Sequence, residues 1–172
     1  TLYHAGRDCD AEIDDALAID GSGWTRNLAA MRALATNDVR RAETHILEAR
    51  RLLPGELPVI VNFAEILRRQ GRLDEALPLL DADDPEALRA GANLLVQDER
   101  HEEADEWYVR ALRKSPFDAE LLTDRAANCL KLDLINEADD LLGRAIGIAP
   151  SARIYRLIAF LAGRTSDVAA AE

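Results

Sequence analysis

Apolar residues recur three and four positions apart through most of this chain, in blocks separated by short polar turns. This spacing places them on one face of an α-helix, and the runs of β-branched and aromatic residues that favour strands are missing. The pattern therefore predicts an all-helical chain. The expected helices are 24–36, one that ends near 53, 58–69, one that opens at 73, 85–97, 102–114, 119–132, 136–148 and 152–162, with the start of another after 164.

Three residues at the predicted helix ends have a defined expected role. Gly71 should take a left-handed backbone conformation where the helix 58–69 ends. Pro78 is expected in the first turn of the next helix, where its missing N–H costs little. Asp84 is expected to cap the helix that follows it.

A group of small, large, small and proline positions recurs along the chain. It occurs as Ala42, Ile46, Ala49 and Pro54, as Ala104, Tyr108, Ala111 and Pro116, and as Ala138, Leu142, Ala145 and Pro150. The last two copies lie 34 residues apart, which indicates that one supersecondary unit is stacked. The predicted organisation is a closing helix of a preceding partial repeat (1–22), repeat 1 (23–56), a shortened repeat 2 (57–84), repeat 3 (85–118), repeat 4 (119–152) and a partial repeat or capping helix (153–172).

These positions resemble the tetratricopeptide repeat (TPR) family, whose unit is a pair of antiparallel helices, A and B. The family's small position in helix A is Ala30, Ala64, Ala92 and Ala126, and its small position early in helix B is Ala42, Ala76, Ala104 and Ala138. Arg26 departs from the family by replacing an aromatic residue, and Asp83 by replacing a small one. The resemblance implies an all-α TPR-type superhelix, a solenoid of helix pairs with helix A lining a concave face.

The resemblance also implies a function and a set of contact residues. The family mostly binds peptides or proteins and contacts them through helix A. Trp24 and Met31 fall on that face. The polar and charged candidates for a peptide-binding groove are Asn27, Asn62, Glu65, Arg69, Arg89, Asn93, Gln97, Thr123, Asp124 and Lys131. Asparagine can donate to and accept from a peptide backbone, and arginine can bind a carboxylate in a fork. The alternative is an ordinary solvated helix face.

A narrower hypothesis is the family's carboxylate clamp, which grips acidic C-terminal tails. Arg89 and Asn93 fit the spacing of its first unit. Asp124 stands where the next unit should offer asparagine, and an acid there repels a carboxylate ligand.

The charge of the chain narrows the class of partner. The formal net charge is −11, with a sequence pI of about 4.7, so binding to a phosphate backbone is disfavoured. No apolar run approaches the length of a membrane span, and we expect no membrane insertion. The expected partner is a protein or peptide, and the solenoid ends are candidates for self-association.

The sequence carries no recognisable catalytic, cofactor or metal signature. The histidines lack ligand spacing, and no Ser-His-Asp or Cys-His arrangement is readable. Cys9 and Cys129 lie some three repeats apart, so we expect free thiols, which favour a cytoplasmic compartment. A periplasmic location stays open, because the chain reads as a fragment. Tyr108 is expected in the core. Trp107 either packs between repeats or lies exposed, and core packing is favoured.

The sequence thus predicts a non-catalytic protein–protein interaction scaffold that uses its concave helix-A face. One alternative is the regulatory or substrate-recruiting repeat region of a larger enzyme, such as a transferase. Another is a structural assembly element of an envelope or secretion apparatus. The fold alone does not separate these functions.

Overall fold

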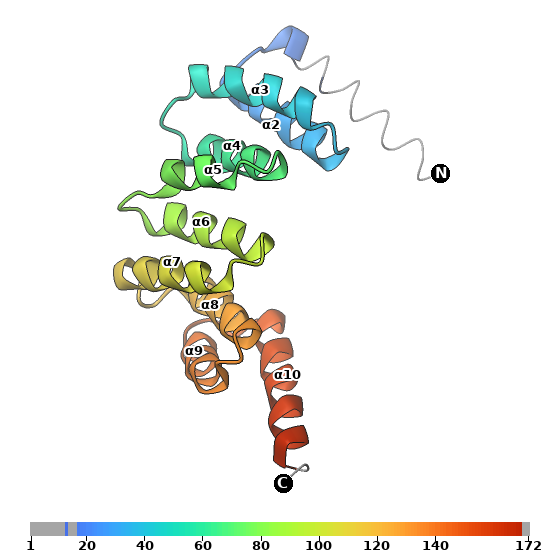
Figure 1. The fold of residues 1–172 in the computed structure, drawn as a ribbon. Helices are drawn as coiled ribbons and strands as arrows, with labels where there is room; N and C mark the ends of the chain where they lie inside the picture. Colours follow the sequence, from blue (N-terminus) through green and yellow to red (C-terminus); the bar gives the residue numbers. More distant parts are fainter. Residues whose placement is uncertain (1–12, 14–16, 170–172) are drawn as a thin grey trace. The chain divides into compact units, whose positions relative to one another are not determined.

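The chain is all-helical over the part that the structure describes (Figure 1). This computed structural model describes residue 13 and residues 17–169, with side chains as far as Arg164. The helices are α2 (Gly23–Ala35), α3 (Val39–Leu52), α4 (Leu57–Arg69), α5 (Leu73–Leu80), α6 (Pro85–Gln97), α7 (His101–Lys114), α8 (Ala119–Lys131), α9 (Ile135–Ile148) and α10 (Ala152–Ala169). The predicted fold class is confirmed. Cys9 and most of the helix predicted within 1–22 lie outside the described residues.

The helices form two compact units, Thr1–Asp81 (unit 1) and Ala82–Glu172 (unit 2). In unit 1, α2 packs against both α3 and α4, and α4 packs against α5. In unit 2, α6 packs against α7, and α8 packs against α7, α9 and α10. The helices α2 and α8 therefore each contact their own antiparallel partner and also the first helix of the next pair. Within the described residues, no helix combines the length and apolar character that crossing a bilayer requires.

Alanine occupies the points where the two helices of a pair cross. Ala30 and Ala42 in the α2–α3 pair are fully buried, as are Ala92 and Ala104 in the α6–α7 pair. The small side chains let the helix axes approach closely, and large neighbours fill the remaining space. Those neighbours are Ile46, Leu80, Tyr108 and Leu142, each at most 2% exposed. The core therefore follows from the small and large positions of the repeated pattern.

The turn inside each of four helix pairs contains one residue with left-handed backbone. These residues are Asn37 (φ 61°), Gly71 (φ 74°), Glu99 (φ 61°) and Asp133 (φ 62°). The prediction for Gly71 is confirmed. The intervals between successive turns are 34, 28 and 34 residues. The short interval follows Gly71, and α5, the helix after that turn, has only 8 residues.

Glu99 should be replaceable by glycine with a gain in stability. A left-handed conformation costs a non-glycine residue about 1–2 kcal/mol, whereas the extra freedom of glycine in the unfolded chain costs about 0.5–1 kcal/mol. Glu99→Gly is therefore expected to raise the free energy of unfolding by up to about 1 kcal/mol, measured by urea denaturation. Gly71→Ala is the matched control and should lower it, because the added Cβ meets no neighbouring atom within 4 Å and leaves only the backbone strain. A loss of stability in Glu99→Gly would contradict the assigned turn.

The position of Pro78 differs from the prediction. Pro78 is the sixth residue of α5, beyond the first turn, so it does not fall among the N–H groups that lack intrahelical partners. Its ring removes the backbone hydrogen bond that the carbonyl of Asp74 would accept. Proline at this position is consistent with the early end of α5 at Leu80.

The last helix also differs from the prediction. We expected a helix over 152–162 and a separate helix after 164, but α10 continues without a break to Ala169. Arg164 donates to the carbonyl oxygen of Leu130 (3.2 Å) and to a carboxylate oxygen of Asp133 (2.6 Å). These contacts fix α10 to the end of α8 one residue after Gly163, so the glycine stays helical.

Candidate functional site

The first candidate surface lies on α2 in unit 1. Trp24, Leu28 and Met31 are 49%, 58% and 37% exposed. Spacings of four and three residues place them on one face of the helix. The helix is fixed at its start by Ser22, whose hydroxyl oxygen accepts from the backbone N–H of Thr25 at 3.3 Å. We call these three side chains the α2 apolar row.

A pair of asparagines stands beside the α2 apolar row. The Nδ2 of Asn62 on α4 donates to the Oδ1 of Asn27 on α2 at 2.8 Å, and both residues are half-buried. This hydrogen bond connects α2 and α4, which are the first helices of two neighbouring helix pairs within unit 1. Each amide keeps further donor and acceptor capacity, since an asparagine side chain offers two N–H donors and an oxygen with two lone pairs.

Glu65 and Arg69 on α4 hold unit 1 together. Glu65 accepts from the Nε of Arg68 (2.8 Å) and of Arg69 (2.7 Å). Burial works to raise the pKa of Glu65, but the hydrogen bonds and charges of the two arginines outweigh it and hold that pKa below its ordinary value. Arg69 also donates from Nη1 to the carbonyl oxygen of Leu34 at the end of α2, at 3.0 Å. The predicted contact residues Glu65 and Arg69 are thus already engaged.

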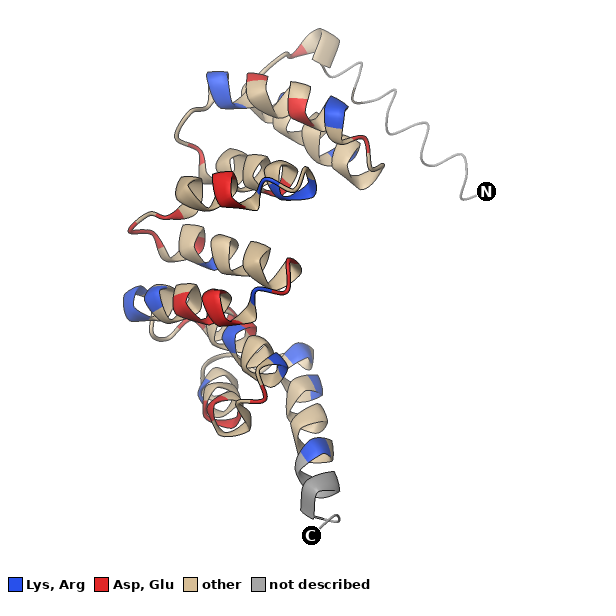
Figure 2. Cartoon of the chain, in the orientation of Figure 1, with Lys and Arg blue, Asp and Glu red and all other residues tan. Residues whose placement is uncertain are grey.

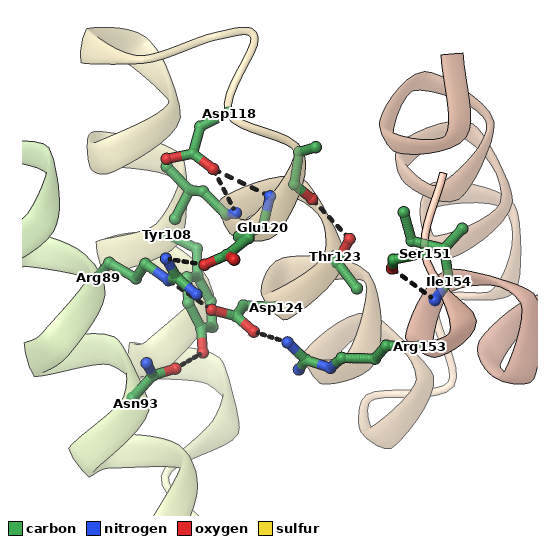
Figure 3. Close-up of polar contacts among 12 residues, drawn as sticks. Arg89, Asn93, Tyr108, Asp118, Glu120, Thr123, Asp124, Ser151, Arg153 and Ile154 are labelled. Atoms are coloured by element: carbon green, nitrogen blue, oxygen red, sulfur yellow. Dashed lines mark hydrogen bonds and ion pairs between the residues drawn. The ribbon is translucent and has the colours of Figure 1, made fainter. Parts of the chain in front are cut away.

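The predicted contact residues of unit 2 form a different arrangement, centred on Asp124 (Figure 3). Asp124 on α8 is 6% exposed, and its two carboxylate oxygens accept from Arg89 Nε (2.6 Å) and Arg153 Nη1 (2.5 Å). Arg89 comes from α6 and Arg153 from α10, so one carboxylate connects three helices. Arg89 also donates to Glu120 on α8 at 2.9 Å.

Asn93 and Tyr108 extend this polar cluster. The hydroxyl of Tyr108 on α7 donates to the Oδ1 of Asn93 on α6 at 2.6 Å. Tyr108 is 2% exposed, so its predicted place in the core is confirmed. Burial, and secondarily the negative charge of Asp124, raise the pKa of Tyr108. The hydroxyl therefore stays protonated and serves as a donor at any ordinary pH.

The other predicted contact residues of unit 2 lie in different settings. Thr123 is 3% exposed and donates to the carbonyl of Ala119 in its own helix. Like Asp124, it is a buried residue whose polar group is engaged within the chain. Gln97 and Lys131 are exposed at the ends of α6 and α8. The carboxylate clamp is disfavoured, because Arg89 already binds two carboxylates of the chain.

Leu28, Arg153 and Glu120 belong to these two clusters but were not among the predicted contact residues. Leu28 shares a helix face with Trp24 and Met31, and its spacing from both was readable. Arg153 and Glu120 carried no comparable signal, because their partners come from other helices.

Cys129 is buried in unit 2 as a free thiol on α8. Burial, with a smaller contribution from the charge of Asp105, raises the pKa of this thiol to about 11. It is therefore protonated at neutral pH and poorly suited to act as a nucleophile or metal ligand. Among the residues whose placement is described, no three His, Cys, Asp or Glu side chains are grouped so that they could hold a metal ion.

Charged residues of opposite sign lie at the two ends of α7. Figure 2 shows acidic residues toward the start of this helix and basic residues at its other end. The first turn carries Glu102 and Glu103, and the last carries Arg113 and Lys114. This arrangement complements the helix dipole, so we assign these charges to helix stability.

Comparison with known proteins places the chain in a family. A TPR repeat-containing protein of Treponema pallidum (strain Nichols) is 35% identical over 184 aligned residues, which cover 100% of this chain and 23% of that protein. The chain therefore spans about a quarter of the length of this relative. No family model matches the chain.

Solved structures show the same fold. The TPR protein TTC0263 of Thermus thermophilus superposes with a TM-score of 0.69 at 19% identity, covering 94% of this chain and 92% of that one. YrrB, a TPR protein with an unusual peptide-binding site, superposes with a TM-score of 0.55 at 18% identity, covering 89% and 82%. This chain belongs to the TPR repeat proteins. Such proteins generally mediate protein–protein interactions.

Proposed function

We propose that this chain is a non-catalytic protein-binding module that holds an extended segment of a partner protein on the helix-A face of unit 1. The observation that carries the proposal is the α2 apolar row of Trp24, Leu28 and Met31 beside the Asn27–Asn62 pair. Exposed aromatic residues and methionine side by side are typical of interaction surfaces, in which they supply much of the binding energy.

The chemistry of the face fits a peptide in extended conformation. The apolar row can bury alternate side chains of the peptide, and the remaining donors and acceptors of the asparagines can bind its backbone. Glu65 and Arg69 act differently, because their hydrogen bonds are made within unit 1. They hold α4 against α2 and so keep the two asparagines in register.

The test is selection of a random peptide display library on the full chain, followed by affinity measurement for the enriched peptides by fluorescence anisotropy. Trp24→Ala is expected to weaken these peptides by about 30-fold, the size of a hot-spot residue of about 2 kcal/mol. Leu28→Ser and Met31→Ser should each weaken them less.

Leu47→Ser is the matched control. Leu47 lies on α3 of the same unit and is 49% exposed, as Trp24 is, but it belongs to the second helix of its repeat. It should leave the affinity unchanged, and circular dichroism checks that every variant is folded. Equal affinities of the wild-type chain and the Trp24→Ala variant, or an equal loss in Leu47→Ser, would refute binding at this face.

A further inference from the structure

A second candidate site lies within unit 2, in a pocket between the N-terminal ends of α8 and α10. The pocket has a volume of about 340 Å³ and is open to solvent on one side. Its apolar lining includes Ala119, Pro150 and Ile154, which we call the apolar floor. Its polar lining residues are Glu120, Thr123, Ser151 and Arg153, and the Thr123 hydroxyl already donates to the carbonyl of Ala119. Figure 3 shows Ser151 and Arg153 of the α10 segment across from the start of α8.

The charges in this pocket balance. Among the described residues that line it, Glu120 is the only acid and Arg153 the only base, and their side chains are 77% and 48% exposed. Each is already partly neutralised, because Oε2 of Glu120 accepts from Arg89 and Nη1 of Arg153 donates to Asp124. A cationic or anionic ligand would meet one attractive and one repulsive neighbour. A neutral ligand with hydrogen-bond donors and acceptors can interact favourably with both Glu120 and Arg153.

The remaining hydrogen-bonding capacity specifies such a ligand further. The second carboxylate oxygen of Glu120 can accept, and the guanidinium of Arg153 has more N–H donors than the one it directs at Asp124. The Ser151 oxygen accepts from the N–H of Ile154 at 3.4 Å, which leaves its O–H to donate. A primary carboxamide matches this set, with its NH₂ toward Glu120 and its oxygen toward Arg153 or Ser151.

We infer that this pocket is a subsite for a glutamine side chain of the bound partner protein. The carboxamide bonds to the polar groups, and the two methylenes lie on the apolar floor, which favours glutamine over the shorter asparagine. The inference rests on the proposed protein-binding function, but it concerns unit 2 alone and predicts a specificity that the α2 apolar row does not.

The experiment uses short peptides, so that it does not depend on knowing the partner. Acetyl-Ala-Ala-Xaa-Ala-Ala-N-methylamide, with glutamine, glutamate, lysine or alanine as Xaa, is titrated into the ¹⁵N-labelled full chain. The backbone resonances of Glu120, Ser151 and Ile154 report on the pocket. We expect the glutamine peptide to bind about tenfold more tightly than the other three. The N-methylamide end avoids a second primary carboxamide.

Two variants and a control locate the site. Ala119→Leu fills the pocket and should abolish the shifts, and Glu120→Gln should remove the preference for glutamine. Glu86→Gln is the matched control, because Glu86 is an exposed acid near the start of α6 and does not line the pocket. It should bind like the wild-type chain. The folded state of each variant is verified by its thermal melt.

Equal binding of the glutamine and glutamate peptides would overturn the inference, as would binding that survives Ala119→Leu or an absence of shifts with every peptide at millimolar concentration. In those cases, display-selected peptides that still depend on Trp24 would leave the proposed function standing. If the binding of the display-selected peptides does not depend on Trp24 either, both proposals are wrong.

Discussion

Asp124→Ala is expected to lower the free energy of unfolding by about 3 kcal/mol. The substitution leaves the guanidinium groups of Arg89 and Arg153 facing each other across a site where the carboxylate is only 6% exposed. Removing one partner of a buried ion pair typically costs about 3–5 kcal/mol. We expect the lower end of that range, because both arginines keep some contact with water.

Urea denaturation monitored by circular dichroism measures this loss. Glu120→Ala is the matched control, since it removes another carboxylate that binds Arg89 but is 77% exposed. An exposed ion pair contributes less than about 1 kcal/mol, so this variant should remain close to the wild-type chain. If the two variants lose the same amount, Asp124 is not the centre of the cluster.

A variant with two substitutions separates charge from packing. Arg89→Met combined with Asp124→Leu replaces the charges with apolar groups of comparable size. Such replacements of buried ion pairs are often close to neutral. The combined variant, with Arg153 left exposed to water, should therefore be more stable than Asp124→Ala. A further loss would indicate that Asp124 acts mainly through hydrogen-bond geometry.

The helices were largely predictable from the sequence because their determinants are local. The spacing of apolar residues, the cap at Asp84 and the left-handed turn at Gly71 each depend on neighbouring residues. The α10 helix was misjudged for the opposite reason. A glycine in a short apolar helix indicates a turn, but Arg164 contacts Leu130 and Asp133, which lie more than thirty residues earlier.

The candidate site was less predictable, because the sequence shows which residues share a helix face and not which of them are already paired. Asp124 was expected to face a ligand, yet it binds Arg153, which lies 29 residues later in the chain. Asn93 likewise uses its oxygen to accept from Tyr108. Substituting such residues would perturb the fold together with any binding. The α2 apolar row provides a better test of function, since its side chains are exposed.

Gly91→Ala is expected to lower the free energy of unfolding by about 1 kcal/mol, although alanine is the better helix former. Gly91 is buried on α6, where an added Cβ would lie 2.3 Å from Cζ3 and 2.5 Å from Cε3 of Trp107 on α7. Trp107 is half-buried here, with Arg110 positioned over its ring. Overpacking of this kind costs about 1–3 kcal/mol, and the roughly 1 kcal/mol that alanine gains in a helix interior offsets only part of that cost.

The contact with Trp107 can be isolated by making the same substitution in two other settings. Gly143 lies in α9 with open space at its Cβ position, so Gly143→Ala should raise the free energy of unfolding by up to about 1 kcal/mol. In a Trp107→Leu background the ring is gone, and Gly91→Ala should become neutral or stabilising. This change of sign, measured as a double-mutant cycle by urea denaturation, would show that the indole ring requires glycine at this position. If Gly91→Ala remains equally destabilising without the ring, the requirement for glycine must lie in the backbone of α6.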